Sequence, residues 1–385
     1  MSKNREEVHP AMNIERAELF PLHIPMKGLF KTSRGAVGGK SNARTVVLIK
    51  LTDEAGHSGW GEASPSRLWS SETMETVVGT LDNYLLPAVI GRDADDIAGI
   101  HQAMNAVIAP AFSSAHPIAK CGIDTAVHDL LGRRRGMSIA KLWGYQPAAE
   151  VALSWTVSAS DMDALERSVD DGLQHGYRNF NVKLGMNAAF DVMQCNWLKE
   201  KVPDGFLWGD ANGGYAFHEI VRILPDLESS GLDLLEQPLP SNQLKDLARL
   251  TSRLRIPIGV DEPIVTPREL MEWIRHDLIT AYVAKPTRNS GLFPSRICME
   301  IARHAPLMTV CSGLTETGVG LAANLQLACA FGVTTPCAWN GPQYLQEDIL
   351  AQPLTIKGGK LQLPAGAGLG IAVDEEKVRY LSSVR

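Results

Sequence analysis

Between Val151 and Trp339, short apolar runs bounded by turn residues alternate with amphipathic stretches of roughly a dozen residues. Alternation of this kind is typical of strand–helix units repeated around a parallel sheet. The apolar runs predict eight strands, at residues 151–157, 179–184, 206–210, 232–237, 256–261, 279–284, 306–311 and 335–339. The stretches 161–176 and 294–305 predict helices, and the first begins at Asp161, a residue type suited to cap a helix N-terminus.

Eight such units within about two hundred residues favour a (β/α)8 TIM barrel over a doubly wound open sheet, which has fewer strands and a glycine-rich dinucleotide turn. No convincing G-x-G-x-x-G follows a predicted strand. Before the barrel, residues 44–63 predict a hairpin and residues 72–144 are mostly helical, whereas 355–366 predicts a further small β element. We therefore expect an α/β chain with three parts: an α+β capping domain at 12–140, a barrel at 145–350, and a C-terminal segment at 351–385 that packs on the cap.

The charge of the chain narrows the range of its partners. The formal net charge of −6 is spread without a basic stripe, which gives no electrostatic reason to expect nucleic acid or an anionic membrane surface as a partner. No apolar run approaches the length of a bilayer helix, and Met1 to Pro10 lacks the apolar core of a signal peptide. We expect a cytoplasmic protein that acts on a small molecule.

Five ionisable residues stand at or just past the ends of five successive predicted strands. They are separated by 27, 26, 25 and 24 residues, which is one strand–helix unit each time: Lys183, Asp210, Glu236, Asp261 and Lys285. Barrel enzymes keep their active sites at the carboxyl ends of the strands. The spacing therefore predicts that these five side chains converge at one mouth of the barrel.

The three acids and two lysines suggest a particular chemistry. Three carboxylates from three strands make a hard, oxygen-rich site suited to Mg²⁺, and the absence of a cysteine or histidine among them disfavours zinc. Any one acid alone would be read as a helix cap or a loop ion pair, but three in register favour a metal site. An ammonium near a divalent cation is destabilised, so a lysine here can titrate low enough to act as a neutral base.

Several long motifs carry a resemblance to a known family. They are CGIDTAVHDLLGRRRGMSIAKLWG at 121–144, LWGDANGGY at 207–215, LLEQPLP at 234–240 and GVDEP at 259–263. In this order they resemble the muconate-lactonizing-enzyme subgroup of the enolase superfamily. The resemblance implies a modified (β/α)7β barrel and a homo-oligomer that binds one Mg²⁺ per subunit, for which Mn²⁺ could substitute.

The resemblance also assigns roles within the motifs. It implies that Asp210, Glu236 and Asp261 are the metal ligands, with Asn212 as a supporting polar group and Glu262 as a neighbour that could exchange roles with Asp261.

The lysines match the subgroup only in part. By the resemblance, the second strand of subgroup members has a K-x-K motif, and its second lysine transfers the proton. In this chain the same three positions are Asn181, Val182 and Lys183. Lys285 matches the lysine on the opposite face of the site. The loss of the first lysine removes a cation beside the base and the substrate carboxylate, so Asn181 changes the surroundings of Lys183.

Two lysines that face each other across a carboxylate allow deprotonation from either side, which is the arrangement of a racemase or epimerase. The same pair can serve a muconate-type cycloisomerase, or a dehydratase acting, for example, on a hydroxyproline. A non-catalytic binding protein of the same fold is a third reading, disfavoured because both lysines and all three acids are present. The lysines alone do not decide among the reactions.

Four further residues are candidates for substrate contact. Glu316 matches a position on the substrate side of the site, although it could equally be a first-turn glutamate of the next helix. The eighth predicted strand carries Ala338-Trp339-Asn340. By the resemblance, this is the position at which related dipeptide epimerases have a D-x-D motif. Trp339, with Trp69 and Phe30 of the cap, could form an aromatic site for an N-alkylated cation, or the tryptophans could simply pack the seam. The aromatic reading favours a carboxylate that resembles proline betaine or hydroxyproline.

Overall fold

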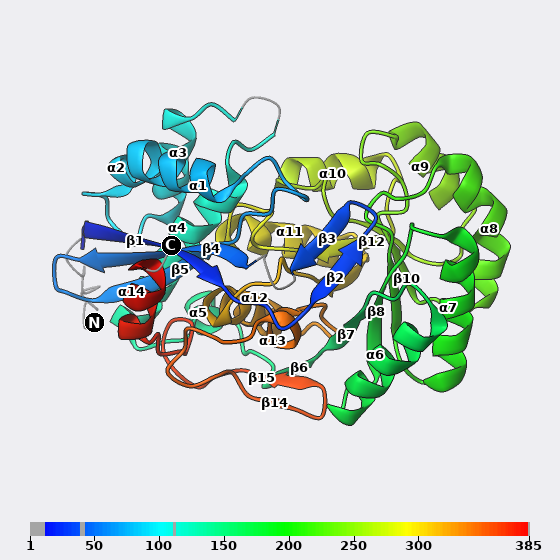
Figure 1. Cartoon of the computed structure of the whole chain (residues 1–385). Helices are drawn as coiled ribbons and strands as arrows, with labels where there is room; N and C mark the ends of the chain where they lie inside the picture. Colours follow the sequence, from blue (N-terminus) through cyan, green and yellow to red (C-terminus); the bar gives the residue numbers. More distant parts are fainter. Residues whose placement is uncertain (1–11, 39–42, 111–112, 384–385) are drawn as a thin grey trace, which may run out of the picture.

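The computed structural model describes residues 12–38, 43–110 and 113–383, and Met1 to Pro10 lies outside them. Figure 1 shows an N-terminal domain beside a larger barrel, with the last helix returning to the N-terminal domain. In the described residues, the barrel strands form one parallel sheet in the order β13-β12-β11-β10-β9-β8-β7. Their bounds are β7 Ser154–Val157, β8 Asn179–Lys183, β9 Leu207–Asp210, β10 Leu234–Glu236, β11 Ile258–Val260, β12 Ala281–Ala284 and β13 Met308–Cys311.

The two edges of this sheet are joined by the eighth predicted strand. Residues 335–339 contribute two bridges rather than a full strand, one from Cys337 to Leu153 beside β7 and one from Ala338 to Ser312 beyond β13. Backbone hydrogen bonds hold both, because the N–H of Ser154 donates to Cys337 and the N–H of Ala338 donates to Cys311. The predicted α/β barrel is therefore confirmed.

One predicted strand is divided in two. Residues 151–157 form β6 (Glu150–Ala152) and β7, and only β7 belongs to the barrel. β6 pairs antiparallel with β15 (Lys360–Gln362), which also pairs with β14 (Ile356–Lys357). An apolar run is continuous in sequence across both strands, so periodicity could not reveal that its first half pairs with the C-terminal segment.

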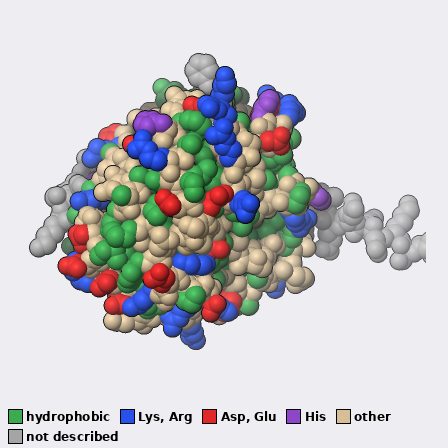
Figure 2. All heavy atoms as spheres, turned by 90° about the vertical axis from the view of Figure 1, so that its right-hand side faces the viewer, with side chains coloured by type: hydrophobic (Ala, Val, Ile, Leu, Met, Phe, Trp, Pro, Cys, Tyr) green, Lys and Arg blue, Asp and Glu red, His purple; other side chains and the backbone are tan. Residues whose placement is uncertain are grey.

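Helices surround the barrel on its outer face (Figure 1). They are α6 Met162–Gln174, α7 Ala188–Lys201, α8 Phe217–Ser229, α9 Leu244–Thr251, α10 Pro267–Arg275, α11 Leu292–His304, α12 Gly318–Ala330 and the short α13 Gly341–Tyr344. The side chain of Asp161 caps α6 as predicted, accepting a hydrogen bond from the N–H of Ala164. Acidic and basic side chains are interspersed on the face seen in Figure 2. Within the described ranges, no helix is both long and apolar enough to span a bilayer.

The N-terminal domain packs a three-stranded antiparallel sheet against helices. The sheet has the order β1-β4-β5, with β1 Ile14–Ile24, β4 Arg44–Asp53 and β5 Ser58–Ala63. Its helices are α1 Met74–Thr80, the π-helix η1 Leu81–Leu85, α2 Leu86–Val89, α3 Ile97–Val107, α4 Pro117–Arg135 and α5 Ile139–Leu142. Helix α4 lies so close to β5 that a Cβ on Gly61 would come within 1.9 Å of the carbonyl oxygen of Gly122. Glycine is therefore required there.

The C-terminal helix and a short hairpin complete the fold. Helix α14 (Glu375–Ser383) packs on β1, and Glu375 forms an ion pair of 2.7 Å with Lys50 of β4. The hairpin of β2 (Leu29–Thr32) and β3 (Gly35–Gly38) extends from the N-terminal domain over the barrel (Figure 1).

Buried carboxylates of the N-terminal domain hold the barrel helices. Glu62 of β5 accepts hydrogen bonds from the N–H of Thr317 (3.0 Å), the N–H of Gly320 (2.8 Å) and the hydroxyl of Thr317 (2.6 Å), at the start of α12. Asp124 of α4 accepts from the N–H of Leu292 (2.5 Å) at the start of α11. Free N–H groups at a helix start favour an anion, so each acid ties the cap to one barrel helix.

We expect the Glu62 carboxyl to make stability depend on pH. Burial raises the pKa of Glu62 to about 7, although hydrogen bonds from Ser64, Thr317 and Gly320 oppose the rise. Because the folded pKa lies above the unfolded value, this group stabilises the fold most below the unfolded pKa, and the contribution, up to about 3 kcal/mol, is lost as the pH rises toward 7. The Glu62→Gln variant should show a flatter change in unfolding free energy between pH 5 and 7.5 in urea titrations.

A matched control is Glu54→Gln, on the exposed turn of the same β4–β5 hairpin. Its pH profile should parallel that of the unchanged protein. Parallel profiles for Glu62→Gln as well would show that Glu62 does not titrate in this range.

Candidate active site

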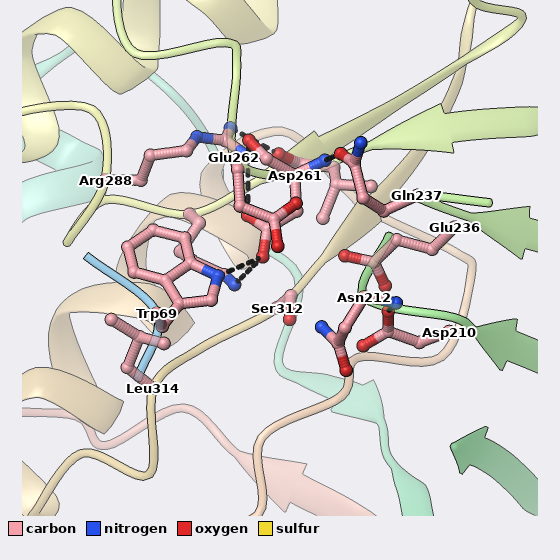
Figure 3. A network of polar contacts seen from close by, with 12 residues as sticks. Trp69, Asp210, Asn212, Glu236, Gln237, Asp261, Glu262, Arg288, Ser312 and Leu314 are labelled. Atoms are coloured by element: carbon pink, nitrogen blue, oxygen red, sulfur yellow. Dashed lines mark hydrogen bonds and ion pairs between the residues drawn. The ribbon is translucent and has the colours of Figure 1, made fainter. Parts of the chain in front are cut away.

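The five residues at the strand ends lie around one mouth of the barrel. Lys183, Asp210 and Glu236 are the last residues of β8, β9 and β10, and they stand opposite one another in the strand register. Asp261 and Lys285 each follow the last residue of β11 and β12. Figure 3 shows the carboxylates of Asp210, Glu236 and Asp261 directed toward a common space. This is the edge at which barrel enzymes keep their active sites.

Each lysine forms an ion pair with a different acid. Nζ of Lys183 lies 2.5 Å from Oδ2 of Asp210, and Nζ of Lys285 contacts Oδ2 of Asp261. Burial acts to lower the pKa of Lys183, but the charges of Asp210 and Glu236 outweigh it and raise the pKa above its ordinary value. The carboxylates thus stabilise the ammonium form of Lys183, whereas the low pKa expected of a lysine beside a divalent cation stays a prediction for the metal-bound site.

Asp261 is the most heavily bonded of the acids. Arg288, 1% exposed, donates from Nη1 to both Oδ1 (2.8 Å) and the main-chain oxygen (2.5 Å) of Asp261. The indole N–H of Trp69 donates to Oδ2 at 3.0 Å (Figure 3). Burial alone would raise the pKa of Asp261, but Lys285 and Arg288 hold it below its usual value. Asp261 therefore remains ionised in a buried position.

Glu236 is held differently. Its Oε2 accepts a hydrogen bond of 2.7 Å from the indole N–H of Trp208, while its buried Oε1 has no hydrogen-bond partner among the described residues. Burial, together with Asp210 and Asp261, raises the pKa of Glu236 well above its ordinary value. In the described ranges no three His, Cys, Asp or Glu side chains form a ready metal cluster. A buried, unpartnered carboxylate oxygen beside two further acids is nevertheless a suitable donor set for a hard divalent cation.

The N-terminal domain closes the site from above. Ser33, at the tip of the β2–β3 hairpin, donates to the carbonyl oxygens of Ala211 (3.0 Å) and Asn212 (3.1 Å). Arg34 donates to the same Asn212 oxygen (3.2 Å) and forms an ion pair of 2.8 Å with Glu262. Burial and the charge of Asp261 raise the pKa of Glu262 to about 7. The hairpin is thus attached to the loops that follow β9 and β11.

A small cavity lies between this hairpin and the barrel mouth. Both lysines, Asp210 and Asp261 line it from below. Three of the predicted substrate contacts, Phe30, Trp69 and Asn212, also line it. The ring of Trp69, however, already lies over the ammonium of Lys285, at 4.6 Å from its centroid. Its face is therefore engaged by a cation of the protein itself.

Trp339 does not line the cavity. It is 3% exposed, packs in the core outside the strands, and donates from its indole N–H to the carbonyl oxygen of Ser312 (3.2 Å). Side chains alternate between the faces of a strand, so Ala338 and Asn340 face inward where Trp339 faces the helices. Asn340 accordingly lines the cavity. The interpretation of Trp339 as a wall of a cation site is wrong for this geometry.

Two other predicted contacts also lie outside the cavity lining. Asn181 is buried in β8, and its side-chain nitrogen has no partner among the described residues. Glu316 is buried below the mouth, where it accepts hydrogen bonds from the hydroxyl of Thr287 (3.1 Å) and the N–H of Leu314 (2.8 Å). Glu316 precedes α12 and so is not a first-turn residue, since Glu62 occupies the helix start.

Sequence reasoning missed the arginines and one glutamine. Arg288 follows Lys285 by three residues, a proximity that could have suggested a partner for Asp261. Gln237, next to Glu236, accepts from the N–H of Asp261 (3.0 Å) in a left-handed backbone conformation that no sequence pattern marks. Arg34 pairs across the domain boundary, so only the tertiary structure reveals its partner.

A wider cavity elsewhere carries no comparable chemistry. It measures about 990 Å³, against about 70 Å³ for the cavity at the barrel mouth, and lies between the cap sheet and the C-terminal segment. Its cationic groups already have partners, since Lys50 pairs with Glu375 and Arg133 with Asp129. The strand ends therefore hold the candidate active site.

Comparison with known proteins gives a consistent result. Residues 164–377 match the family model described as enolase C-terminal domain-like, and residues 18–144 match the N-terminal domain of mandelate racemase / muconate lactonizing enzyme. The chain is 32% identical over 364 residues to the N-succinylamino acid racemase of Thermus thermophilus, covering 94% of this chain and 95% of that protein.

Cycloisomerases are similar as well. Muconate cycloisomerase 1 of Rhodococcus opacus is 29% identical over 347 residues, covering 88% of this chain and 91% of that one. The crystal structure of 2-chloromuconate cycloisomerase from Rhodococcus opacus 1CP superposes with a TM-score of 0.88 at 27% identity, covering 96% and 99% of the two chains.

We expect Arg288→Met to destabilise the protein by about 3–5 kcal/mol, because it leaves the buried Asp261 without its guanidinium partner. Arg288→Lys keeps the charge but has one nitrogen in place of Nη1 and Nη2, which bond Asp261 and Val283, so its stability should lie between those of Arg288→Met and the unchanged protein. Urea unfolding measures both. The control Arg303→Met removes an exposed arginine paired with Glu300 and should cost less than about 1 kcal/mol. A loss for Arg288→Met no larger than the control's would contradict the assigned role.

Proposed function

Because the chain belongs to the mandelate racemase / muconate lactonizing enzyme family of the enolase superfamily, we propose that it is a Mg²⁺-dependent racemase or epimerase of an amino-acid derivative. The reaction would remove the proton next to a substrate carboxylate and return one from the other face. Its relatives are racemases and cycloisomerases, so the chemistry is of a kind the family performs.

The position of the two lysines is the observation that carries the proposal. Lys183 ends β8 and Lys285 follows β12, four strand positions away in a ring that residues 337–338 close as an eighth member. The two ammonium groups therefore come from opposite sides of the mouth, with the acids of β9, β10 and β11 between them. A carboxylate held over these acids would present its neighbouring carbon to one lysine on each face.

Asp210, Glu236 and Asp261 would hold the metal. When bound, Mg²⁺ offsets the negative charge that builds on the carboxylate oxygens of the substrate. The residues of the chain do the rest: one lysine takes the proton at its Nζ, the other delivers one from its own Nζ, and Trp69 with the β2–β3 hairpin excludes water from the mouth. Arg288 keeps Asp261 oriented throughout.

The position of Trp339 favours an N-acylated amino acid over a substrate that resembles proline betaine. A substrate that resembles proline betaine depended on Trp339 facing the site, and Trp339 faces the helices instead. The N-succinylamino acid racemase to which the chain is 32% identical supports an N-acylated amino acid in its place. We therefore take N-succinylamino acids as the first substrates to test.

Exchange with solvent tests the lysines. In D₂O with Mg²⁺, both enantiomers of an N-succinylamino acid should gain deuterium at the α-carbon, as followed by NMR. Lys183→Ala should slow exchange of one enantiomer by about 100- to 10,000-fold, and Lys285→Ala that of the other, because each lysine serves one face. Lys199→Ala, a lysine of α7 paired with Asp233, is the matched control and should leave both rates unchanged.

Other outcomes would point elsewhere. A product that has lost water and gained no deuterium in the remaining substrate indicates a dehydratase. Conversion of a muconate to its lactone without exchange of N-succinylamino acids indicates a cycloisomerase. Full activity in both lysine variants would rule out the two-lysine mechanism.

Removal of the metal is the second test. Treatment with EDTA should abolish exchange, and Mg²⁺ should restore it. Independently of turnover, calorimetric titration should show Mg²⁺ binding at least about 10-fold weaker in Asp210→Asn, since a ligand charge is lost. Asp226→Asn, an exposed residue of α8, is the control. Unchanged Mg²⁺ binding in Asp210→Asn would remove Asp210 from the proposed ligand set.

A further inference from the structure

A further cation, Arg44, is buried beside the cavity at the barrel mouth. Arg44, the first residue of β4, is 5% exposed and lines the same cavity as Lys183 and Lys285. It occupies the seam between a cap loop and a barrel loop. Its Nη1 donates to the carbonyl oxygen of Pro65 (2.6 Å), its Nη2 to that of Ser64 (3.0 Å), and its Nε to that of Thr315 (3.3 Å).

These contacts leave donors and charge unmatched. A guanidinium carries five N–H groups, so three hydrogen bonds to neutral carbonyls leave one N–H on each terminal nitrogen. Among the described residues, no carboxylate forms an ion pair with Arg44, although Lys183, Lys285, Arg288 and Arg34 each have one. A buried charge without an opposite charge is costly, and such groups are normally paired.

The nearest acids are already engaged. Glu62 and Glu316 are close enough to act on the Arg44 charge, but Glu62 binds the start of α12 and Glu316 binds Thr287 and Leu314. Burial lowers the pKa of Arg44 in spite of both acids. Neither acid forms an ion pair with Arg44 among the described residues, so its two remaining N–H groups are available to an anion in the cavity.

The cavity suggests where such a partner would sit. Beyond the lysines and acids its lining is mixed. It includes the apolar side chains of Phe30, Val37, Leu68 and Leu314, together with polar groups such as Thr315. Arg34, Lys183 and Lys285 also line the cavity, but each is paired with an acid. Arg44 has no such ion pair among the described residues, which suits it to bind the anionic end of a carbon chain. The reacting carboxylate would remain with the acids and lysines.

We propose that Arg44 is a specificity-determining residue that binds a second, distal carboxylate, so that the substrate is a dicarboxylate with one carboxylate at each end. The inference rests on the proposed function for the position of the reacting carboxylate. It adds to that function the charge and the shape of the other end of the substrate.

A pair of achiral probes isolates this charge. N-succinylglycine and N-succinamoylglycine have the same length and the same glycine carboxylate, but only the first carries a distal carboxylate. With Mg²⁺ present, calorimetry should show N-succinylglycine binding about 10- to 100-fold tighter to the unchanged protein, as expected for a buried charge-assisted contact. Arg44→Gln should bring the ratio close to one, and Arg44→Lys should retain part of it.

The matched control is Arg67→Gln, which removes an exposed cation from the same cap loop outside this cavity. It should preserve the ratio. Equal weakening of both probes in Arg44→Gln and Arg44→Lys would make Arg44 a structural support for the loops, and equal binding of both probes by the unchanged protein would likewise overturn the proposal.

Exchange of the glycine α-protons in D₂O separates the two proposals. A binding preference that depends on Arg44 but occurs without exchange supports the distal site and counts against the proposed reaction. Exchange of both probes at equal affinity supports the reaction and refutes the role of Arg44.

Discussion

The concentration of negative charge at the barrel mouth is the constraint on which the rest of the structure depends. Asp210, Glu236, Asp261 and Glu262 stand on adjacent strands and are all buried or nearly so. Burial, and then the charge of the neighbouring acids, raises the pKa values of Glu236 and Glu262. Four cations from different segments form ion pairs with these acids: Lys183, Lys285, Arg288 and Arg34.

The source of these cations explains why the two domains must meet at the mouth. Three come from the barrel, but Arg34 comes from the β2–β3 hairpin of the cap. A different cap loop supplies Trp69, whose indole N–H donates to Asp261. The cap is in turn fixed by Glu62 and Asp124 at the starts of α12 and α11. The body of the cap is thus held by buried acids at helix ends, whereas the hairpin is held by contacts to the loops of the active site. The hairpin contacts are the more exposed of the two sets, since the Arg34 side chain is 31% exposed whereas Glu62 and Asp124 are buried.

The sequence predicted the parts of this arrangement that depend on repetition. Strand–helix spacing was enough to align five ionisable residues, because each unit of a barrel adds one strand end to the same mouth. Strand–helix spacing could not predict contacts between residues far apart in the sequence, such as the pairing of β6 with the C-terminal segment and the contacts of Arg34 and Arg44. Strand alternation was available for Trp339, and applying it to Ala338-Trp339-Asn340 would have placed Asn340, not Trp339, at the site.

Asn181 gives the distribution of cations a further meaning. A lysine at this position would lie two residues from Lys183 on the same face of β8 and add a charge near the reacting carboxylate. This chain has an amide there, whose nitrogen is buried without a partner among the described residues. Arg44, a buried cation of the cap, lines the same cavity as Lys183. Charge near the reacting carbon stabilises the transition state, whereas charge far from it stabilises bound substrate and transition state alike. The distal role that we propose for Arg44 would therefore contribute selectivity for the substrate rather than stabilisation specific to the proton transfer.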